Sequence, residues 1–183
     1  MAYMVSLLDD GKKAKIHKKN LNNKNVIQTL YANKIAKEKI ADKLCIRAEN
    51  VRFSFGKHSK PYLEDEKLWF NISHSGKMVA VVISEEPVGV DVERNFAFNP
   101  RLAKKICNNS EMRFLEKSSD KDSLLTKLWT IKESFLKASG EGITVNISDV
   151  ICDTDQNCVT YCERTAPFFT KNINGYTVSV CVL

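Results

Sequence analysis

Apolar side chains recur along the chain with two helical spacings. Between residues 24 and 44 they return every three or four positions, which predicts one amphipathic helix. Leu128, Ile131 and Phe135 repeat this spacing and predict a second helix, which the glycines shortly after it would end. Lys132 falls inside the apolar stripe of the second helix. Because burying a lone charge is costly, we expect this lysine to have an anionic partner.

Strand patterns fill much of the remaining chain. The continuous apolar run from Met78 to Ile83 is typical of a strand buried on both faces, and shorter strands are expected at 68–76 and 88–93. The last forty or so residues alternate: Tyr176, Val178, Val180 and Val182 face one way, and Thr177, Ser179 and Cys181 face the other. Two short helices are expected between these regions, one beginning at Pro100 and one capped by Ser110.

The order of elements, helix and then strands, occurs twice. The break lies at Glu85-Glu86-Pro87. We therefore expect two similar halves, residues 1–84 and 85–183, that form one compact unit. No sequence repeat strong enough to prove the similarity is found.

Composition narrows the class of protein. With 183 residues, 43% of them hydrophobic and 27% charged, the chain resembles an ordinary soluble globular protein. No apolar run is long enough to span a membrane, and the first residues lack the features of a secretory signal. The six cysteines show no zinc-like paired spacing, so reduced thiols and a cytoplasmic location are expected.

The net charge of +6 comes largely from lysines near the N-terminus. They form either a solvated surface or a positive field that attracts a phosphorylated ligand or an acidic protein. Nucleic acid is a poor alternative, because no recognition-helix, zinc-finger or aromatic-basic pattern accompanies the charge.

Asp91 and Glu93 are the first candidates for chemistry. They lie two residues apart in an expected strand, so both carboxylates point to the same face. On a solvent-exposed strand such a pair would be unremarkable. Here it interrupts an apolar segment, and two crowded carboxylates repel each other unless a divalent cation lies between them. With Glu133 as a third oxygen ligand, the set would suit Mg²⁺, which fills its remaining positions with water and substrate phosphate.

Other candidates are weaker when each is taken alone. His74, within Asn71-Ile72-Ser73-His74-Ser75-Gly76, is either structural or a donor to a phosphate. Lys60 is either a surface lysine or a phosphate ligand. Glu133 and Lys137 lie one turn apart and could simply stabilise their helix.

Together, these residues resemble the motifs of the 4′-phosphopantetheinyl transferases of the surfactin-synthetase-activating type. Four stretches match in order: Lys-Pro-Tyr-Leu at 60–63, Phe-Asn-Ile-Ser-His-Ser at 70–75, Gly-Val-Asp-Val-Glu at 89–93, and Trp-Thr-Ile-Lys-Glu-Ser-Phe-Leu-Lys at 129–137. The similarity covers roughly residues 50–145, and the last two stretches are the most specific. Ser59 stands where the family usually has glycine. The family's Arg-rich N-terminal stretch has no clear counterpart here, although Lys13, Lys15, Lys18 and Lys19 could substitute for it.

The resemblance implies a fold and a reaction. The fold would be α+β and sandwich-like, with two halves that each hold a mostly antiparallel sheet and a long helix, related by a pseudo-twofold axis. The reaction would transfer the 4′-phosphopantetheine arm of coenzyme A to a serine of an apo acyl or peptidyl carrier protein, leaving adenosine 3′,5′-bisphosphate. A non-catalytic module of the same fold that binds coenzyme A or a carrier protein is the alternative.

The resemblance also implies roles for individual residues. Asp91, Glu93 and Glu133 would hold Mg²⁺, and Glu133 would also take the proton of the attacking serine. Lys60, Ser73, His74 and Lys137 would bind the phosphates of coenzyme A. Lys132 would either pair with a carboxylate of the site or extend its amine to solvent or phosphate. Partners would be an acidic carrier protein and coenzyme A, with no nucleic acid and no membrane, and the chain would act as a monomer.

Overall fold

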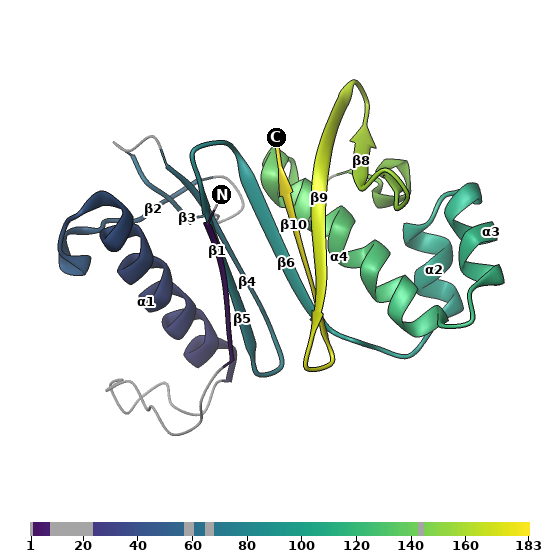
Figure 1. Cartoon of the computed structure of the whole chain (residues 1–183), viewed down its shortest axis with the longest axis horizontal. Helices are drawn as coiled ribbons and strands as arrows, with labels where there is room; N and C mark the ends of the chain where they lie inside the picture. Colours follow the sequence, from purple (N-terminus) through teal and green to yellow (C-terminus); the bar gives the residue numbers. More distant parts are fainter. Residues whose placement is uncertain (1, 8–23, 57–60, 65–67, 143–144) are drawn as a thin grey trace.

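A computed structural model describes residues 2–7, 24–56, 61–64, 68–142 and 145–183. Within these ranges the chain forms four α-helices and two main antiparallel sheets, and a two-stranded ribbon lies beside the first sheet (Figure 1). This mixture confirms the expected α+β class.

The first sheet has three strands in the order β1-β5-β4, and helix α1 packs on one of its faces. Ile35, Ala36 and Ile40 of α1 contribute to a buried cluster with residues of β4 and β5. The helix predicted at 24–44 is confirmed. The bounds are β1 Ala2–Leu7, α1 Lys24–Leu44, the 3₁₀ turn η2 Ala48–Asn50, β2 Ser54–Phe55, β3 Pro61–Tyr62, β4 Trp69–Ser75 and β5 Met78–Ser84.

The second sheet has five strands in the order β6-β10-β9-β8-β7, and helix α4 lies across one of its faces. Helices α2 and α3 pack beyond α4 (Figure 1). The bounds are β6 Val88–Arg94, α2 Pro100–Ile106, α3 Asn109–Lys117, α4 Lys121–Ser139, the 3₁₀ turn η5 Ile147–Asp149, β7 Ile151–Asp153, β8 Cys158–Tyr161, β9 Arg164–Ile173 and β10 Tyr176–Val182.

Strand β5 explains the longest apolar run of the sequence. Every residue of Met78–Ser84 is buried. Val79, Val81 and Ile83 belong to the cluster under α1. Met78, Ala80 and Val82 belong to another cluster, together with valines of β6 and β10. The strand is therefore buried on both faces, as predicted, because each face meets a different apolar layer.

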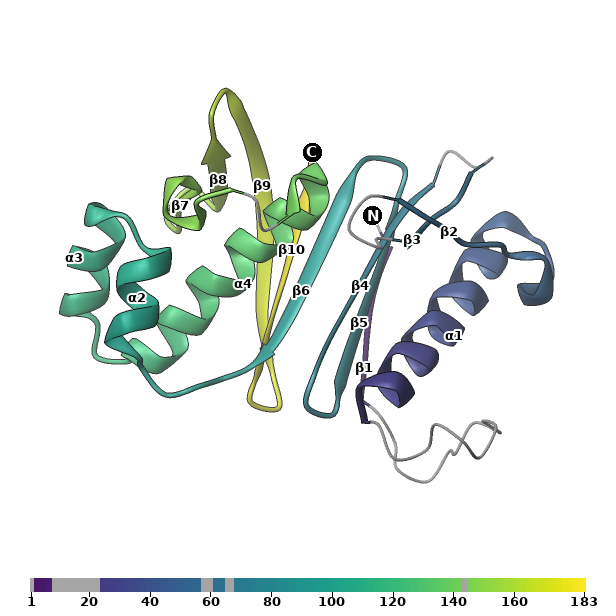
Figure 2. The same ribbon diagram turned by 180° about the vertical axis from the view of Figure 1, so that it is seen from behind.

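The molecule is layered as α1, first sheet, second sheet and α4, and Figure 2 shows the same succession from behind. The two sheets meet along β4 and β6. Each long helix thus covers the face of its sheet that points away from the other sheet.

The predicted cap of the third helix is wrong. Asn108, not Ser110, caps α3: its Oδ1 accepts the backbone N–H of Ser110 and of Glu111, each at 2.9 Å. Glu111 Oε2 in return accepts the N–H of Asn108 at 2.9 Å, which completes a capping box. Ser110 lies in the first turn. The start of α2 at Pro100 is confirmed, with Asn99 as its cap.

In the described ranges, no helix combines the length and the apolar character needed to cross a lipid bilayer.

Candidate active site

Strand β6 and helix α4 pack unusually close together at Gly89. A Cβ atom at this position would lie 2.0 Å from the backbone oxygen of Ser134 and 2.5 Å from the backbone nitrogen of Ala138. Only glycine allows this approach. Asp91 and Glu93 follow on the same face of β6, so the missing side chain brings both carboxylates against the last turns of α4.

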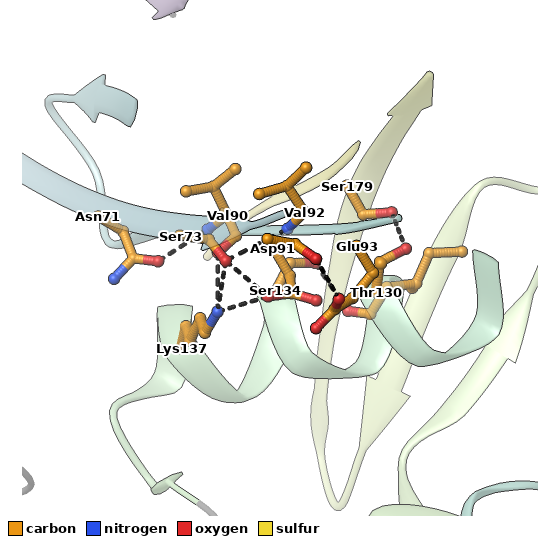
Figure 3. Close-up of polar contacts among 12 residues, drawn as sticks. Asn71, Ser73, Val90, Asp91, Val92, Glu93, Thr130, Ser134, Lys137 and Ser179 are labelled. Carbon is orange, nitrogen blue, oxygen red and sulfur yellow. Dashed lines mark hydrogen bonds and ion pairs between the residues drawn. The ribbon is translucent and has the colours of Figure 1, made fainter. Parts of the chain in front are cut away.

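Asp91 is the centre of the contacts at this junction (Figure 3). Its Oδ1 lies 2.6 Å from Lys137 Nζ and also accepts the hydroxyl of Ser73 at 2.9 Å. Lys137 Nζ donates further to Ser73 Oγ at 3.2 Å and to the backbone oxygen of Val90 at 3.3 Å. The carboxylate is 6% exposed and the lysine side chain 29%, so the amine lies at the edge of solvent.

Ser75 holds the second carboxylate of β6. Its hydroxyl donates to Glu93 Oε2 at 2.7 Å. Ser73 and Ser75 therefore place one hydroxyl on each acidic side chain, and both come from β4 of the first sheet.

Burial and mutual repulsion disfavour the charged forms of the remaining carboxylates. The pKa of Glu93 is raised by burial and by the neighbouring charge of Asp91, although the hydrogen bond from Ser75 works in the other direction. The pKa of Glu133 is raised by burial and by repulsion from Asp91 and Glu93, with Lys137 opposing. The three carboxylates that the sequence singled out thus share one electrostatic site.

We tested whether these residues suit a divalent cation. Within the described parts of the chain, no three His, Cys, Asp or Glu side chains are already arranged as a metal cage. Asp91 Oδ2, however, is buried without a hydrogen-bond partner, a costly state for a carboxylate oxygen. One free buried oxygen beside two carboxylates with raised pKa fits a hard cation such as Mg²⁺, which needs few protein ligands. Asp91, Glu93 and Glu133 are the residues that could hold it.

His74 faces away from this junction, toward α1. Its Nε2 lies 3.4 Å from Thr29 Oγ1, and burial lowers the pKa of the ring. Thr29 was not predicted as a site residue, because nothing in its local sequence distinguishes it from any polar residue of an amphipathic helix. Lys60 and Lys13, Lys15, Lys18 and Lys19 lie outside the described residues.

Ser73 was predicted to assist in binding phosphate. In the structure it is buried, and its hydroxyl contacts Asp91 and Lys137. A role toward phosphate stays a prediction.

Lys132 has the anionic partner that its sequence position requires. Its Nζ lies 2.7 Å from Glu111 Oε2 and 2.5 Å from the backbone oxygen of Ile106, and the side chain is fully buried. Both sequence-based placements of this lysine are wrong. The partner is not one of the three site carboxylates, and the amine does not reach solvent. The spacing within α4 could not reveal it, because Glu111 comes from another helix.

A cavity of about 1110 Å³ opens beyond the C-terminal end of α4. Pro61 and Tyr62 of β3 and Trp69 of β4 line it on one side, together with Gly140 after α4 and Arg164 of β9. Its walls mix aromatic rings with charged side chains, a composition common in sites for small organic ligands.

These features define the class of protein when they are set beside known families. A family model described as "4'-phosphopantetheinyl transferase superfamily" matches residues 87–181, the segment that begins just before β6 and includes α4. The chain belongs to this superfamily and is a phosphopantetheinyl transferase enzyme.

The relatives extend the match over most of the chain. The "4'-phosphopantetheinyl transferase gsp" of Aneurinibacillus migulanus is 30% identical over 170 residues, which cover 89% of this chain and 71% of that protein. The "4'-phosphopantetheinyl transferase Sfp" of Bacillus subtilis (strain 168) is 26% identical and covers 84% of this chain and 73% of its own length. Among solved structures, the holo-[acyl-carrier-protein] synthase of Thermotoga maritima aligns over 53% of this chain and 62% of its own, with 21% identity and a TM-score of 0.47.

Proposed function

We propose that the chain transfers the 4′-phosphopantetheine group of coenzyme A to a serine of an apo acyl or peptidyl carrier protein, with adenosine 3′,5′-bisphosphate as the second product. One observation carries the proposal. In a chain of this superfamily, the carboxylates of Asp91, Glu93 and Glu133 and the amine of Lys137 meet at one junction, and a buried oxygen of Asp91 has no hydrogen-bond partner.

The reaction joins a serine hydroxyl to a phosphorus atom that already carries negative charge. The serine oxygen forms the new P–O bond, and the bond to the bisphosphate oxygen breaks. Mg²⁺ held by Asp91, Glu93 and Glu133 would neutralise charge on the pyrophosphate. Glu133, with its raised pKa, would take the serine proton. Lys137 would turn from Asp91 to the phosphate oxygens, where its charge is needed as the leaving group departs.

Coenzyme A would lie between the halves. We propose that residues 1–84 and 85–183 are the functional halves, related by a pseudo-twofold axis, and that the cavity lined by Pro61, Trp69 and Gly140 receives part of the coenzyme. His74 would contact a phosphate together with Lys60, and Thr29 would share that contact because it already touches the His74 ring.

The carrier protein would be acidic and attracted by the net charge of +6. We propose that the chain acts on it as a monomer in the cytoplasm. Binding coenzyme A without any transfer remains the alternative, favoured only by the contacts with Asp91 and Ser73 that occupy the Lys137 amine.

The test is a transfer assay. The chain, coenzyme A and Mg²⁺ are mixed with several apo carrier proteins, and mass spectrometry follows the gain of one phosphopantetheine arm. We expect transfer that EDTA abolishes and that added Mg²⁺ restores. Asp91→Ala should lose activity by about 1000-fold while its circular dichroism stays unchanged. Binding of coenzyme A with no transfer to any carrier would establish the alternative.

A further inference from the structure

Strands β4 and β6 are both edge strands, and their edges face each other. In the described part of the chain, the backbone of β4 pairs with β5 alone, and the backbone of β6 pairs with β10 alone. Backbone N–H groups on the free edge of β6 need acceptors, because a buried group left unpaired costs free energy. The acceptors are side chains, not the backbone of β4.

Three residues of β4 supply these acceptors at every second position. Asn71 Oδ1 accepts the N–H of Val90 at 2.9 Å, Ser73 Oγ accepts the N–H of Val92 at 3.3 Å, and Ser75 Oγ accepts the N–H of Arg94 at 3.2 Å. Each bond joins residues 19 positions apart, so the two strands run parallel in a fixed register. We call Asn71, Ser73 and Ser75 the side-chain ladder.

Two members of the ladder do more than join the sheets. The hydroxyls of Ser73 and Ser75 accept a backbone N–H of β6 and at the same time donate to Asp91 and Glu93. The backbone bond fixes where the hydroxyl oxygen lies. Its hydrogen then has one good acceptor, which is the adjacent carboxylate.

The opposite side of β4 contacts different residues. Phe70 and Ile72 pack under α1, and His74 touches Thr29 of that helix. On one side β4 therefore carries His74, the proposed coenzyme contact. On the other side it carries Ser73 and Ser75, which hold the proposed metal ligands Asp91 and Glu93.

We propose that Ser75 is a positioning residue for Glu93. The affinity for the metal then depends on the side-chain ladder that joins the two sheets. In this role Ser75 would contact Glu93 and not the substrate or the metal. It acts by holding a carboxylate oxygen in place before the cation arrives. This inference rests on the proposed metal role of Asp91, Glu93 and Glu133.

The experiment measures Mn²⁺ binding to the full chain without coenzyme A, from the electron paramagnetic resonance signal of free Mn²⁺. Ser75→Thr keeps the hydroxyl, and Ser75→Val has the shape of that threonine with a methyl group in place of the hydroxyl. We expect the valine variant to raise the Kd for Mn²⁺ by about tenfold and the threonine variant to stay within about twofold of the wild type. Ser75→Ala gives a second reading of the same loss if the valine variant does not fold.

The matched control is Ser84→Val. Ser84 is also a buried strand serine whose hydroxyl accepts one backbone N–H, from Glu86, but among the described residues no carboxylate contact accompanies it. Its Kd should match that of the wild type. Equal Mn²⁺ affinity in the wild type and the hydroxyl-lacking variants of Ser75 would overturn the proposal, and so would an equal loss in Ser84→Val.

Asp91→Ala separates this proposal from the one on which it rests. Loss of Mn²⁺ binding in Asp91→Ala, with normal binding in Ser75→Val, would refute the ladder and leave the metal site standing. Unchanged binding in Asp91→Ala would refute the metal site itself, and the ladder proposal with it.

Discussion

Helix α4 carries two lysines that form ion pairs of nearly equal length in different surroundings. Lys132 Nζ lies 2.7 Å from Glu111 Oε2, and Lys137 Nζ lies 2.6 Å from Asp91 Oδ1. Glu111 is fully used, since its Oε1 also accepts the N–H of Cys152 and its Oε2 the N–H of Asn108. Asp91 keeps one buried oxygen without a partner.

This difference separates a structural ion pair from the pair that we propose to act in phosphopantetheine transfer. The Lys132–Glu111 pair joins α4 to the start of α3 and to β7, and every contact serves the fold. The Lys137–Asp91 pair stands at the edge of solvent with binding capacity to spare. The length of the ion pair alone would not distinguish the two pairs. The unpaired oxygen of Asp91 distinguishes them.

The largest expected effect is on protein stability, when the Lys132–Glu111 pair is broken. Lys132→Met should lower the free energy of unfolding by about 3–5 kcal/mol, because it leaves Glu111 charged and buried without its partner. Urea unfolding followed by circular dichroism measures this loss. Lys127→Met, on the half-buried side of the same helix, is the control and should change stability by less than about 1 kcal/mol. A comparable loss in both variants would contradict the comparison.

The second prediction concerns Lys137, whose replacement should affect activity more than stability. Lys137→Met should lower the turnover of phosphopantetheine transfer by about 100-fold, because a charge needed at the phosphate is gone. Its free energy of unfolding should change much less than that of Lys132→Met, since the amine is partly exposed. Steady-state kinetics and urea unfolding on the same preparation measure both effects. Unchanged turnover would place Lys137 with the structural lysines.

The third prediction concerns replacement of the whole structural pair. Adding Glu111→Leu to Lys132→Met should recover about 2 kcal/mol, because no unpaired buried charge is left. Recovery should stay partial, since the backbone N–H groups of Asn108 and Cys152 lose their acceptor. A double variant no more stable than the single one would show that these N–H contacts, and not the charge, dominate.

The smallest expected effect lies on the far side of β4. His74→Ala should raise the KM for coenzyme A by about tenfold, which corresponds to about 1.4 kcal/mol, and leave turnover within about twofold. A loss confined to turnover would instead connect His74 to Lys137.

The sequence predicted what depends on local periodicity. The helix at 24–44 and the doubly buried strand at Met78–Ile83 follow from spacing and are confirmed. The grouping of Asp91, Glu93 and Glu133 as metal ligands stays a prediction, supported by the repulsion from Asp91 and Glu93 that raises the pKa of Glu133. The sequence could not predict contacts between distant elements. Glu111 was invisible as the partner of Lys132, because the two residues belong to different helices.

The misplaced cap has a similar cause. Ser110 and Asn108 are both good caps, and the choice depends on Glu111, whose carboxylate returns to the N–H of Asn108 and also binds Lys132. Thr29 and Ser75 were missed because their roles come from side chains across a layer boundary. The period-two pattern of Asn71, Ser73 and Ser75 was visible in the sequence, and so was the strand at 88–93, but nothing in the sequence indicated that the two strands lie side by side.

The contact at Gly89 sets how far this region can vary. A methyl group there would overlap the backbone of α4 at Ser134, and backbone cannot rotate away as a side chain can. In a library of all single substitutions, position 89 should therefore tolerate almost nothing, while Val90 beside it should accept other branched apolar residues. The absence of a Cβ atom at Gly89 thus sets the distance between the carboxylates of β6 and Lys137 of α4. A relative with a side chain at this position would need α4 to lie farther from β6, which would change the distance between the carboxylates and the lysine.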